Sequence, residues 1–206
     1  MPACLIISGG EFMPLPEETE YAFVIACDHG YDHAKKMGIV PNLLIGDMDS
    51  MKSVSVDPKI PVLRYPVKKD DSDTMLAIRY AIENGYDRIV LICALGGRLD
   101  HILANLQGMA YAIGKGCACE IIGEETVTVM KGPGRTERPR RDGYALSLFS
   151  LTDRVEHLTI KGALYPAEDI CMTNTFPLGL SNGWVEDTIE IRLEQGILLI
   201  VESRKT

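Results

Sequence analysis

Two common nucleotide-binding signatures are missing from this chain of 206 residues. It has no G-x-x-x-x-G-K-[ST] segment and no G-x-G-x-x-G segment, so neither a P-loop nor a dinucleotide fingerprint is predicted. No apolar run approaches the ~20 residues that a membrane-spanning helix requires, so no membrane partner is expected. The six cysteines form no C-x-x-C pair and have no partners at zinc spacing, which argues against a zinc or dithiol site.

Positive charge is also scarce. The 21 Lys and Arg residues against 29 Asp and Glu residues give a formal net charge of −8 at pH 7. Such a balance argues against unspecific binding to nucleic acid or to an anionic membrane surface. An anionic substrate would therefore need a metal ion or a local group of Lys and Arg side chains. Because Cys4, Cys27 and Cys93 lie in apolar runs and no signal-peptide pattern is seen, we expect a cytoplasmic protein.

The first half of the sequence alternates between strand-like and helix-like segments. Apolar runs predict strands at 3–8, 21–27, 42–45, 61–65, 88–95 and 118–123. Helical patterns lie between several of them, at 31–37, 74–84 and about 100–113. Buried strands separated by helices are typical of a mostly parallel sheet with helices on both faces.

After about residue 124 the helical patterns stop. Strands are predicted at 126–130, 144–150, 156–162, 188–193 and 197–203. The segment LEQG (193–196) is predicted as a hairpin turn, and KGPGRTERPRR (131–141) as a loop, either simply solvated or a basic flap that contacts phosphate. We therefore expect an α/β domain over 1–124 and a smaller antiparallel, sandwich-like all-β domain over 125–206.

Acidic residues follow four strands of the first domain. In chain order they are Asp28, the pair Asp47 and Asp49, the group Asp70, Asp71 and Asp73, and Asp100. Ligands of an open α/β sheet sit beyond the carboxyl ends of its strands, so these acids are expected to converge there. Taken singly each could be a turn or cap residue, and for Asp70 or Asp71 capping of the 74–84 helix is the better explanation. Four such coincidences on four loops are improbable, so a divalent metal site is predicted.

The predicted metal is Mg²⁺. Hard cations prefer oxygen ligands, and Mg²⁺ in proteins is typically held by a few carboxylates together with substrate phosphates. The sequence thus indicates a phosphate-bearing substrate, and a nucleotide is expected. Its phosphates would be held by Lys68, Lys69 and Arg98, and by the backbone N–H groups of SGG (8–10) and GGR (96–98).

Five segments together resemble one enzyme family. In chain order they are DHG (28–30), GDMDS (46–50), YPVKKDDSD (65–73), GGRLDH (96–101) and GLSNGW (179–184). Their order and spacing are similar to those of the thiamin pyrophosphokinase family, over nearly the whole chain. The resemblance implies transfer of the pyrophosphoryl group of ATP to the hydroxyl of thiamin, giving thiamin diphosphate and AMP. It also implies Mg²⁺, an ATP-binding first domain, a thiamin-binding second domain, and a homodimer with the active site at the subunit interface.

The resemblance also assigns roles to residues. The implied metal ligands are Asp28, Asp47, Asp49, Asp70 and Asp73, and the implied catalytic acids are Asp49, Asp73 and Asp100. The implied nucleotide-binding residues are Ser50, Lys69, Ser72, Arg98 and His101. The implied thiamin-binding residues are Ser181, Asn182 and Trp184.

Several alternatives stay open. The proton of the thiamin hydroxyl could be taken by Asp73 or Asp100. Trp184, the only tryptophan, could offer a π face to the cationic thiazolium or could simply be a core residue. The acids at 47 and 49 could instead belong to another Mg²⁺-dependent, nucleotide-using transferase with a D-x-D metal site. A non-catalytic module that binds a nucleotide or thiamin is the remaining reading.

Overall fold

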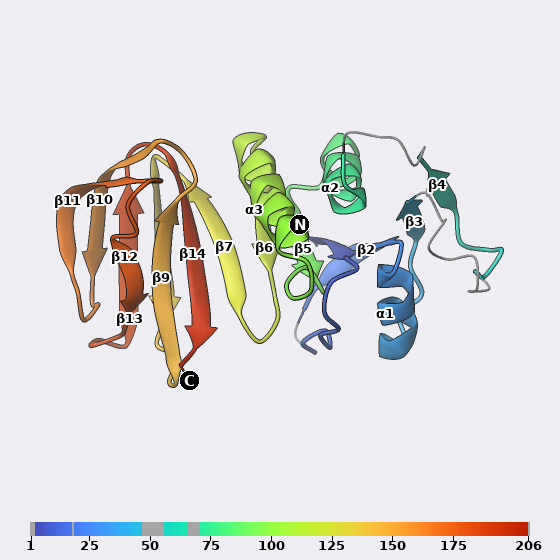
Figure 1. Ribbon diagram of the computed structural model, residues 1–206, viewed down its shortest axis with the longest axis horizontal. Coiled ribbons are helices and arrows are strands. Elements are labelled where there is room, and N and C mark those ends of the chain that lie inside the picture. The colour runs from blue at the N-terminus through green and yellow to red at the C-terminus, as the bar shows by residue number, and fades with distance from the viewer. Residues whose placement is uncertain (1–2, 18, 47–55, 66–70, 206) are drawn as a thin grey trace. The chain divides into compact units, whose positions relative to one another are not determined.

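The computed structural model describes residues 3–17, 19–46, 56–65 and 71–205 (Figure 1). The chain divides into two compact units, Met1–Gly123 and Glu124–Thr206. Within the described ranges, no helix is both long enough and apolar enough to cross a membrane.

The first unit is an α/β unit. In chain order it contains β1 (Ala3–Ile7), β2 (Tyr21–Cys27), α1 (Gly30–Met37), β3 (Leu43–Gly46), β4 (Val62–Arg64), α2 (Asp73–Glu83), β5 (Arg88–Ile92), α3 (Leu99–Gly114) and β6 (Ala118–Ile121). Its strands lie in the order β6-β5-β1-β2-β3-β4, and each neighbouring pair is parallel. The predicted parallel sheet is confirmed.

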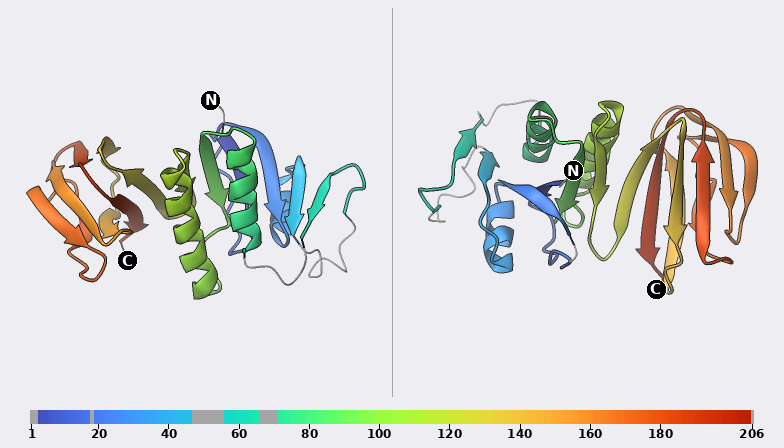
Figure 2. Two further views of the ribbon diagram at one scale, coloured as in Figure 1. Left: turned by 90° about the horizontal axis from the view of Figure 1, so that it is seen from above. Right: turned by 180° about the vertical axis from the view of Figure 1, so that it is seen from behind.

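Helices cover both faces of this sheet. Figures 1 and 2 show α1 on one face and α2 and α3 on the other. Alternate residues of β1 serve the two faces: Ala3, Leu5 and Ile7 share a core cluster with Tyr31 and Ala34 of α1, while the residues between them point the opposite way. The central strands are buried on both sides, which is why they read as unbroken apolar runs.

The second unit consists of antiparallel strands. In chain order they are β7 (Thr126–Lys131), β8 (Gly134–Pro139), β9 (Tyr144–Ser150), β10 (Arg154–Lys161), β11 (Ala167–Thr173), β12 (Gly179–Asn182), β13 (Thr188–Leu193) and β14 (Ile197–Arg204). They form two four-stranded layers, in the orders β12-β9-β14-β7 and β11-β10-β13-β8. A shared core of buried side chains, including Leu158, Ile191 and Leu198, lies between the layers. The predicted sandwich-like all-β unit is confirmed.

Two local predictions for this unit are wrong. The segment 131–141 is not a loop, because six of its residues form β8 and pair with β13 in unbroken register, from Gly134↔Leu193 to Pro139↔Thr188. LEQG is not a hairpin turn, because β13 and β14 belong to different layers. The chain changes layer at Gly196, whose φ is 97° and where a Cβ would stand 2.4 Å from the carbonyl oxygen of Arg154. The strands β11 and β12 were not predicted.

Candidate active site

A cavity of about 640 Å³ opens at the carboxyl edge of the parallel sheet. Its wall is made by residues 8–11 after β1, His29 after β2, Thr74 in α2, Ala94, Gly96 and Gly97 after β5, and the N-cap Arg98, His101 and Asn105 of α3. This volume lies in the range of small-molecule sites, and the position is the one where open α/β sheets bind ligands. All of these residues belong to the first unit.

Buried polar contacts fix the helices against the strand ends. The hydroxyl groups of Ser8 and Thr74 lie 3.0 Å apart and are both buried, which ties the end of β1 to the first turn of α2. The side-chain amide of Asn105 donates to the carbonyl oxygen of Ala94 at 2.8 Å, which ties α3 to the segment after β5. Because buried polar groups are costly when left unpaired, these bonds hold the cavity wall in one arrangement.

The segment after β1 runs close to the segment after β5. The N–H of Gly10 donates to the carbonyl oxygen of Cys93 at 2.7 Å, and the N–H of Glu11 donates to that of Leu95 at 2.9 Å. A Cβ at Gly10 would stand 2.6 Å from both of these carbonyl oxygens, so a glycine is needed here for the close approach. The expected SGG and GGR segments therefore lie side by side at the cavity.

Asp28 is held in an uncommon backbone conformation at the end of β2. Its φ is 39°, its N–H donates to the carbonyl oxygen of Ile45 at 3.3 Å, and its own carbonyl oxygen accepts from the N–H of Tyr31 at 3.0 Å. Residues with positive φ other than glycine gather at functional sites. The carboxylate lies against Gly46, where GDMDS begins. The predicted ligands Asp47 and Asp49, and Ser50, lie outside the described residues.

Asp73 is the first residue of α2. Its carbonyl oxygen accepts a hydrogen bond from the thiol of Cys27 at 3.5 Å, which places the backbone of Asp73 beside the residue that precedes Asp28. The structure thus brings two of the predicted metal ligands to neighbouring strand and helix ends. Lys68, Lys69 and Asp70 lie outside the described residues.

The cap of α2 differs from the expectation. Ser72, predicted to face the nucleotide, is the N-cap, and its hydroxyl accepts from the N–H of Met75 at 3.2 Å. Asp71 is not a cap, because its carboxylate pairs instead with the guanidinium of Arg79 at 2.7 Å. A serine N-cap satisfies one of the free N–H groups of the first turn.

Arg98, Asp100 and His101 form a compact group at the start of α3. The guanidinium of Arg98 contacts the carboxylate of Asp100 through Nη2 at 2.5 Å and Nε at 3.1 Å, and the N–H of His101 donates to the same carboxylate at 3.1 Å. These bonds hold the pKa of Asp100 below its ordinary value, the hydrogen bond from Arg98 being the largest cause. Arg98 and His101 line the cavity, and their contact with a nucleotide stays a prediction.

The carboxylates suit a hard cation. Among the described residues there is no group of three or more His, Cys, Asp and Glu side chains that could hold a metal ion. Three of the five predicted ligands lie outside those residues. The other two, Asp28 and Asp73, are oxygen donors at the edge of the cavity-bearing sheet, and oxygen donors are what Mg²⁺ prefers.

In the second unit, two of the predicted thiamin-binding side chains are buried in the interior. Trp184 is only 9 % exposed, lies in the core cluster, and donates from Nε1 to the carbonyl oxygen of Arg138 at 2.9 Å. Asn182 is buried and exchanges two hydrogen bonds of 2.9 Å with the backbone of Tyr165, while its oxygen also accepts from the N–H of Gly183. Of the two alternatives left open for Trp184, this burial agrees with the core residue, and a contact of Trp184 or Asn182 with thiamin stays a prediction. Ser181 is exposed.

Sequence reasoning missed several residues of the cavity. Glu11, Thr74 and Asn105 line it, although none of the three was among the residues predicted to bind a ligand. The signal for Asn105 was an amide within an apolar helical pattern, since a buried amide needs a partner. Nothing in the sequence distinguished Glu11 from the other acids.

Comparison with known proteins gives concordant results. The family model described as the catalytic domain of thiamin pyrophosphokinase matches residues 17–121, and the model described as its vitamin B1 binding domain matches residues 135–198. The chain is 27 % identical to the thiamine pyrophosphokinase of Bacillus subtilis, over 96 % of this chain and 97 % of that protein.

Solved structures share the fold. The crystal structure of the Bacillus subtilis thiamine pyrophosphokinase has a TM-score of 0.86 at 24 % identity, covering 99 % of this chain and 100 % of that one. The Geobacillus thermodenitrificans thiamin pyrophosphokinase has a TM-score of 0.83 at 24 % identity, with 99 % and 98 % covered. The Candida albicans thiamin pyrophosphokinase has a TM-score of 0.75 at 13 % identity, with 98 % and 89 % covered.

Proposed function

This chain belongs to the thiamin pyrophosphokinase family, and on that premise we propose that it is the enzyme that transfers the pyrophosphoryl group of ATP to thiamin. The products are thiamin diphosphate and AMP. The observation that carries this proposal is that both family models match, in order, the two units of the fold. The α/β unit is then the catalytic, ATP-binding domain, and the β unit is the thiamin-binding domain.

The reaction is a displacement at phosphorus. The hydroxyl oxygen of thiamin forms a bond to the β-phosphorus of ATP, and the bond from that phosphorus to the oxygen it shares with the α-phosphate breaks. AMP leaves with the electron pair, and the hydroxyl proton passes to a carboxylate. Because phosphoryl transfer depends mainly on positioning and charge neutralisation, the residues have to hold the phosphates and align the hydroxyl.

We assign these tasks to the cavity and the acids beside it. Asp28 and Asp73, with Asp47, Asp49 and Asp70, would hold Mg²⁺, which when bound neutralises phosphate charge. Arg98 and His101 line the cavity and supply positive charge and hydrogen-bond donors to the phosphates.

The carboxylate of Asp100 is engaged by Arg98 and has a lowered pKa, so it orients that guanidinium and is a weak base. Asp73, at the first turn of α2, where its carbonyl oxygen accepts from the thiol of Cys27, is therefore the proposed proton acceptor.

An exposed apolar patch supports the dimer and the thiamin site. It consists of Leu164, Tyr165, Leu178, Leu180 and Val185, each more than half exposed. Hydrogen bonds from Leu164 to Gly183 and from Tyr165 to Asn182 gather these residues around the 179–185 segment. Exposed apolar patches of this kind mark interaction surfaces. We place the subunit contact of a homodimer there, with Ser181 at its edge as the contact to thiamin.

Product analysis tests the proposal. The purified chain is incubated with ATP, Mg²⁺ and thiamin, and AMP and thiamin diphosphate are measured together. We expect equal amounts of the two products, none without thiamin, and a loss of activity on chelation of Mg²⁺. Release of ADP, or of a nucleoside diphosphate from a sugar nucleotide, would support a different transferase, and binding without turnover would support a non-catalytic module.

Matched variants separate chemistry from folding. Asp28→Asn and Asp73→Asn keep the size of the side chain while removing its charge, so we expect product formation to fall at least about 100-fold without unfolding. Asp142→Asn, at a highly exposed position of the second unit, is the control, and its product formation should be unchanged.

A cytoplasmic location belongs to the same proposal and is supported by six free cysteines.

A further inference from the structure

His33 connects helix α1 to the wall of the cavity. Its Nε2 lies 2.9 Å from the carbonyl oxygen of Gly10, one of the residues that line the cavity. A carbonyl oxygen can only accept, so Nε2 carries the proton and donates it. The bond crosses from the second turn of α1 to the segment that follows β1.

The other ring nitrogen of His33, Nδ1, is buried and has no hydrogen-bond partner among the described residues. The ring of Phe12 packs beside the imidazole, with 5.6 Å between the ring centroids. Burying a polar atom without a partner destabilises a fold, so an apolar side chain would serve packing better here. What the imidazole adds is the bond to Gly10.

That bond fixes one peptide group from both sides. The carbonyl oxygen of Gly10 and the N–H of Glu11 belong to the same peptide unit and point in opposite directions. The first accepts from His33, and the second donates to the carbonyl oxygen of Leu95 at 2.9 Å. The peptide is therefore held between α1 and the segment after β5, and it cannot rotate without losing one bond.

The fixed peptide sets the position of Glu11 in the wall. A Cβ at Gly96 would stand 2.5 Å from Cβ of Glu11 and 2.6 Å from its Oε2, so the Glu11 side chain lies directly over Gly96. The segments 8–11 and 94–97 thus form one continuous wall, supported from outside by His33.

We propose that His33 is a positioning residue for the nucleotide: through Gly10 it holds the wall formed by residues 8–11 in the conformation that receives ATP. The inference rests on the proposed function, because it takes this cavity as the ATP site. Without the bond, the Gly10–Glu11 peptide is free to turn, and ATP binding has to restore its orientation. The proposal assigns this wall to ATP, so thiamin binding is expected to be unaffected.

Two variants and a control test this role. His33→Ala removes the donor, and we expect the KM for ATP to rise about three- to tenfold, the effect of one hydrogen bond, with kcat and the KM for thiamin within about twofold of the parent. His33→Gln retains an N–H₂ donor on a side chain of similar reach and should restore the KM for ATP to within about twofold. Lys35→Ala, on the exposed side of the same helix, should leave all three constants unchanged.

The outcomes separate this inference from the proposed function. Titration of each folded variant with ATP alone, without thiamin, should show the same three- to tenfold weakening for His33→Ala. If the parent forms AMP and thiamin diphosphate but His33→Ala binds ATP normally, the positioning role is wrong and the function stands. The role is also wrong if His33→Gln raises the KM for ATP as much as His33→Ala does. It is equally wrong if His33→Ala raises the KM for ATP and the KM for thiamin together. A parent that forms no product overturns the function first.

Discussion

The carboxylate of Asp28 rests directly on Gly46, so that a Cβ at position 46 would stand 1.9 Å from Oδ1 of Asp28. Asp28 directly follows β2, and Gly46 is the last residue of the neighbouring parallel strand β3; the two strands pair up to Cys27 and Ile45. The carboxylate is thereby directed at the start of GDMDS, in which the predicted ligands Asp47 and Asp49 follow in the sequence. A glycine at this point leaves room for the acid.

Gly46→Ala should therefore disable the site without unfolding the domain. The added methyl group would displace the Asp28 carboxylate, and a misplacement of about 1 Å in a catalytic group can cost about 100-fold in rate. We expect a loss of that size in thiamin-dependent AMP formation, together with a lower melting temperature, because Gly46 has a φ of 159° that residues with a Cβ rarely adopt. Gly114→Ala is the control, since a Cβ there meets nothing within 4 Å. Near-normal turnover in Gly46→Ala would remove Asp28 from the metal site.

Trp184→Ala should mainly lower the stability of the protein rather than its affinity for thiamin. The indole is buried in the core of the second unit and hydrogen-bonded to Arg138, so we expect a loss of about 3–5 kcal/mol in the free energy of unfolding. Trp184→Phe retains most of the packing and should lose much less. Urea unfolding followed by circular dichroism measures both. A stable Trp184→Ala protein with a raised KM for thiamin would instead show that the indole faces the ligand.

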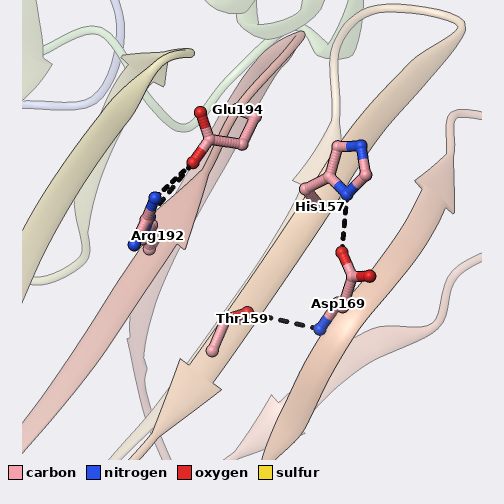
Figure 3. Close-up of polar contacts among 5 residues, drawn as sticks. All are labelled: His157, Thr159, Asp169, Arg192 and Glu194. Atoms are coloured by element: carbon pink, nitrogen blue, oxygen red, sulfur yellow. Dashed lines mark hydrogen bonds and ion pairs between the residues drawn. The ribbon is translucent and has the colours of Figure 1, made fainter.

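An exposed ion pair predicts a pH dependence of stability. On β10 and β11, Nδ1 of His157 lies 2.6 Å from Oδ1 of Asp169, and both residues have positive φ, of 55° and 52° (Figure 3). The hydrogen bond that His157 donates to the carboxylate of Asp169 raises the pKa of His157 above its ordinary 6.5. Because the folded-state pKa is the higher one, the pair stabilises fully below the ordinary pKa and loses this contribution as the pH rises through the folded-state pKa.

The test compares the parent with His157→Gln. The urea midpoint of unfolding is measured for both proteins at about pH 5.5 and at about pH 8.5. The parent should exceed His157→Gln at the lower pH, and this difference should shrink at the higher pH. Asp169→Asn should show the same trend. A difference that grows with pH would contradict the assignment, as would identical curves.

The thiols should fall into two classes of reactivity. Cys171 is exposed, whereas the other five cysteines are buried. Burial raises the pKa of Cys4 to about 12 and that of Cys117 to about 11, which leaves almost no thiolate at neutral pH. With a colorimetric disulfide reagent we expect one fast thiol per chain, lost in Cys171→Ser, and six after unfolding. A second fast thiol in the folded protein would show that one of the strands opens readily.

The parallel sheet was the most predictable part of the molecule. Strands such as β1 and β5 are buried on both faces, so their apolar runs are continuous and stand out from the helices between them. The acids Asp28 and Asp73 could be placed at the carboxyl edge by the same logic, since parallel strands all end on one side.

The edge strands were not predictable in this way. In β8 each side chain is exposed or half-buried, and its sequence GRTERP contains the residues that usually indicate a loop. β11 pairs with β10 through two register shifts, so its pattern does not alternate cleanly. Short-range signals at Gln195 and Gly196 indicated a break between two strands, but they could not reveal that the chain there moves from one layer to the other. For Trp184, sequence context suggested a ligand contact, while burial against Arg138 could be seen only in the fold.

The strand β14 joins the strands of its layer, so the folding of the second unit depends on it. It pairs along its length with β7 on one side and β9 on the other, two strands that have no other link within the layer. A fragment that stopped before Ile197 would present two bare strand edges above an opened core, and bare edges pair readily with other chains. Such a fragment should therefore accumulate as aggregates rather than as a smaller folded protein.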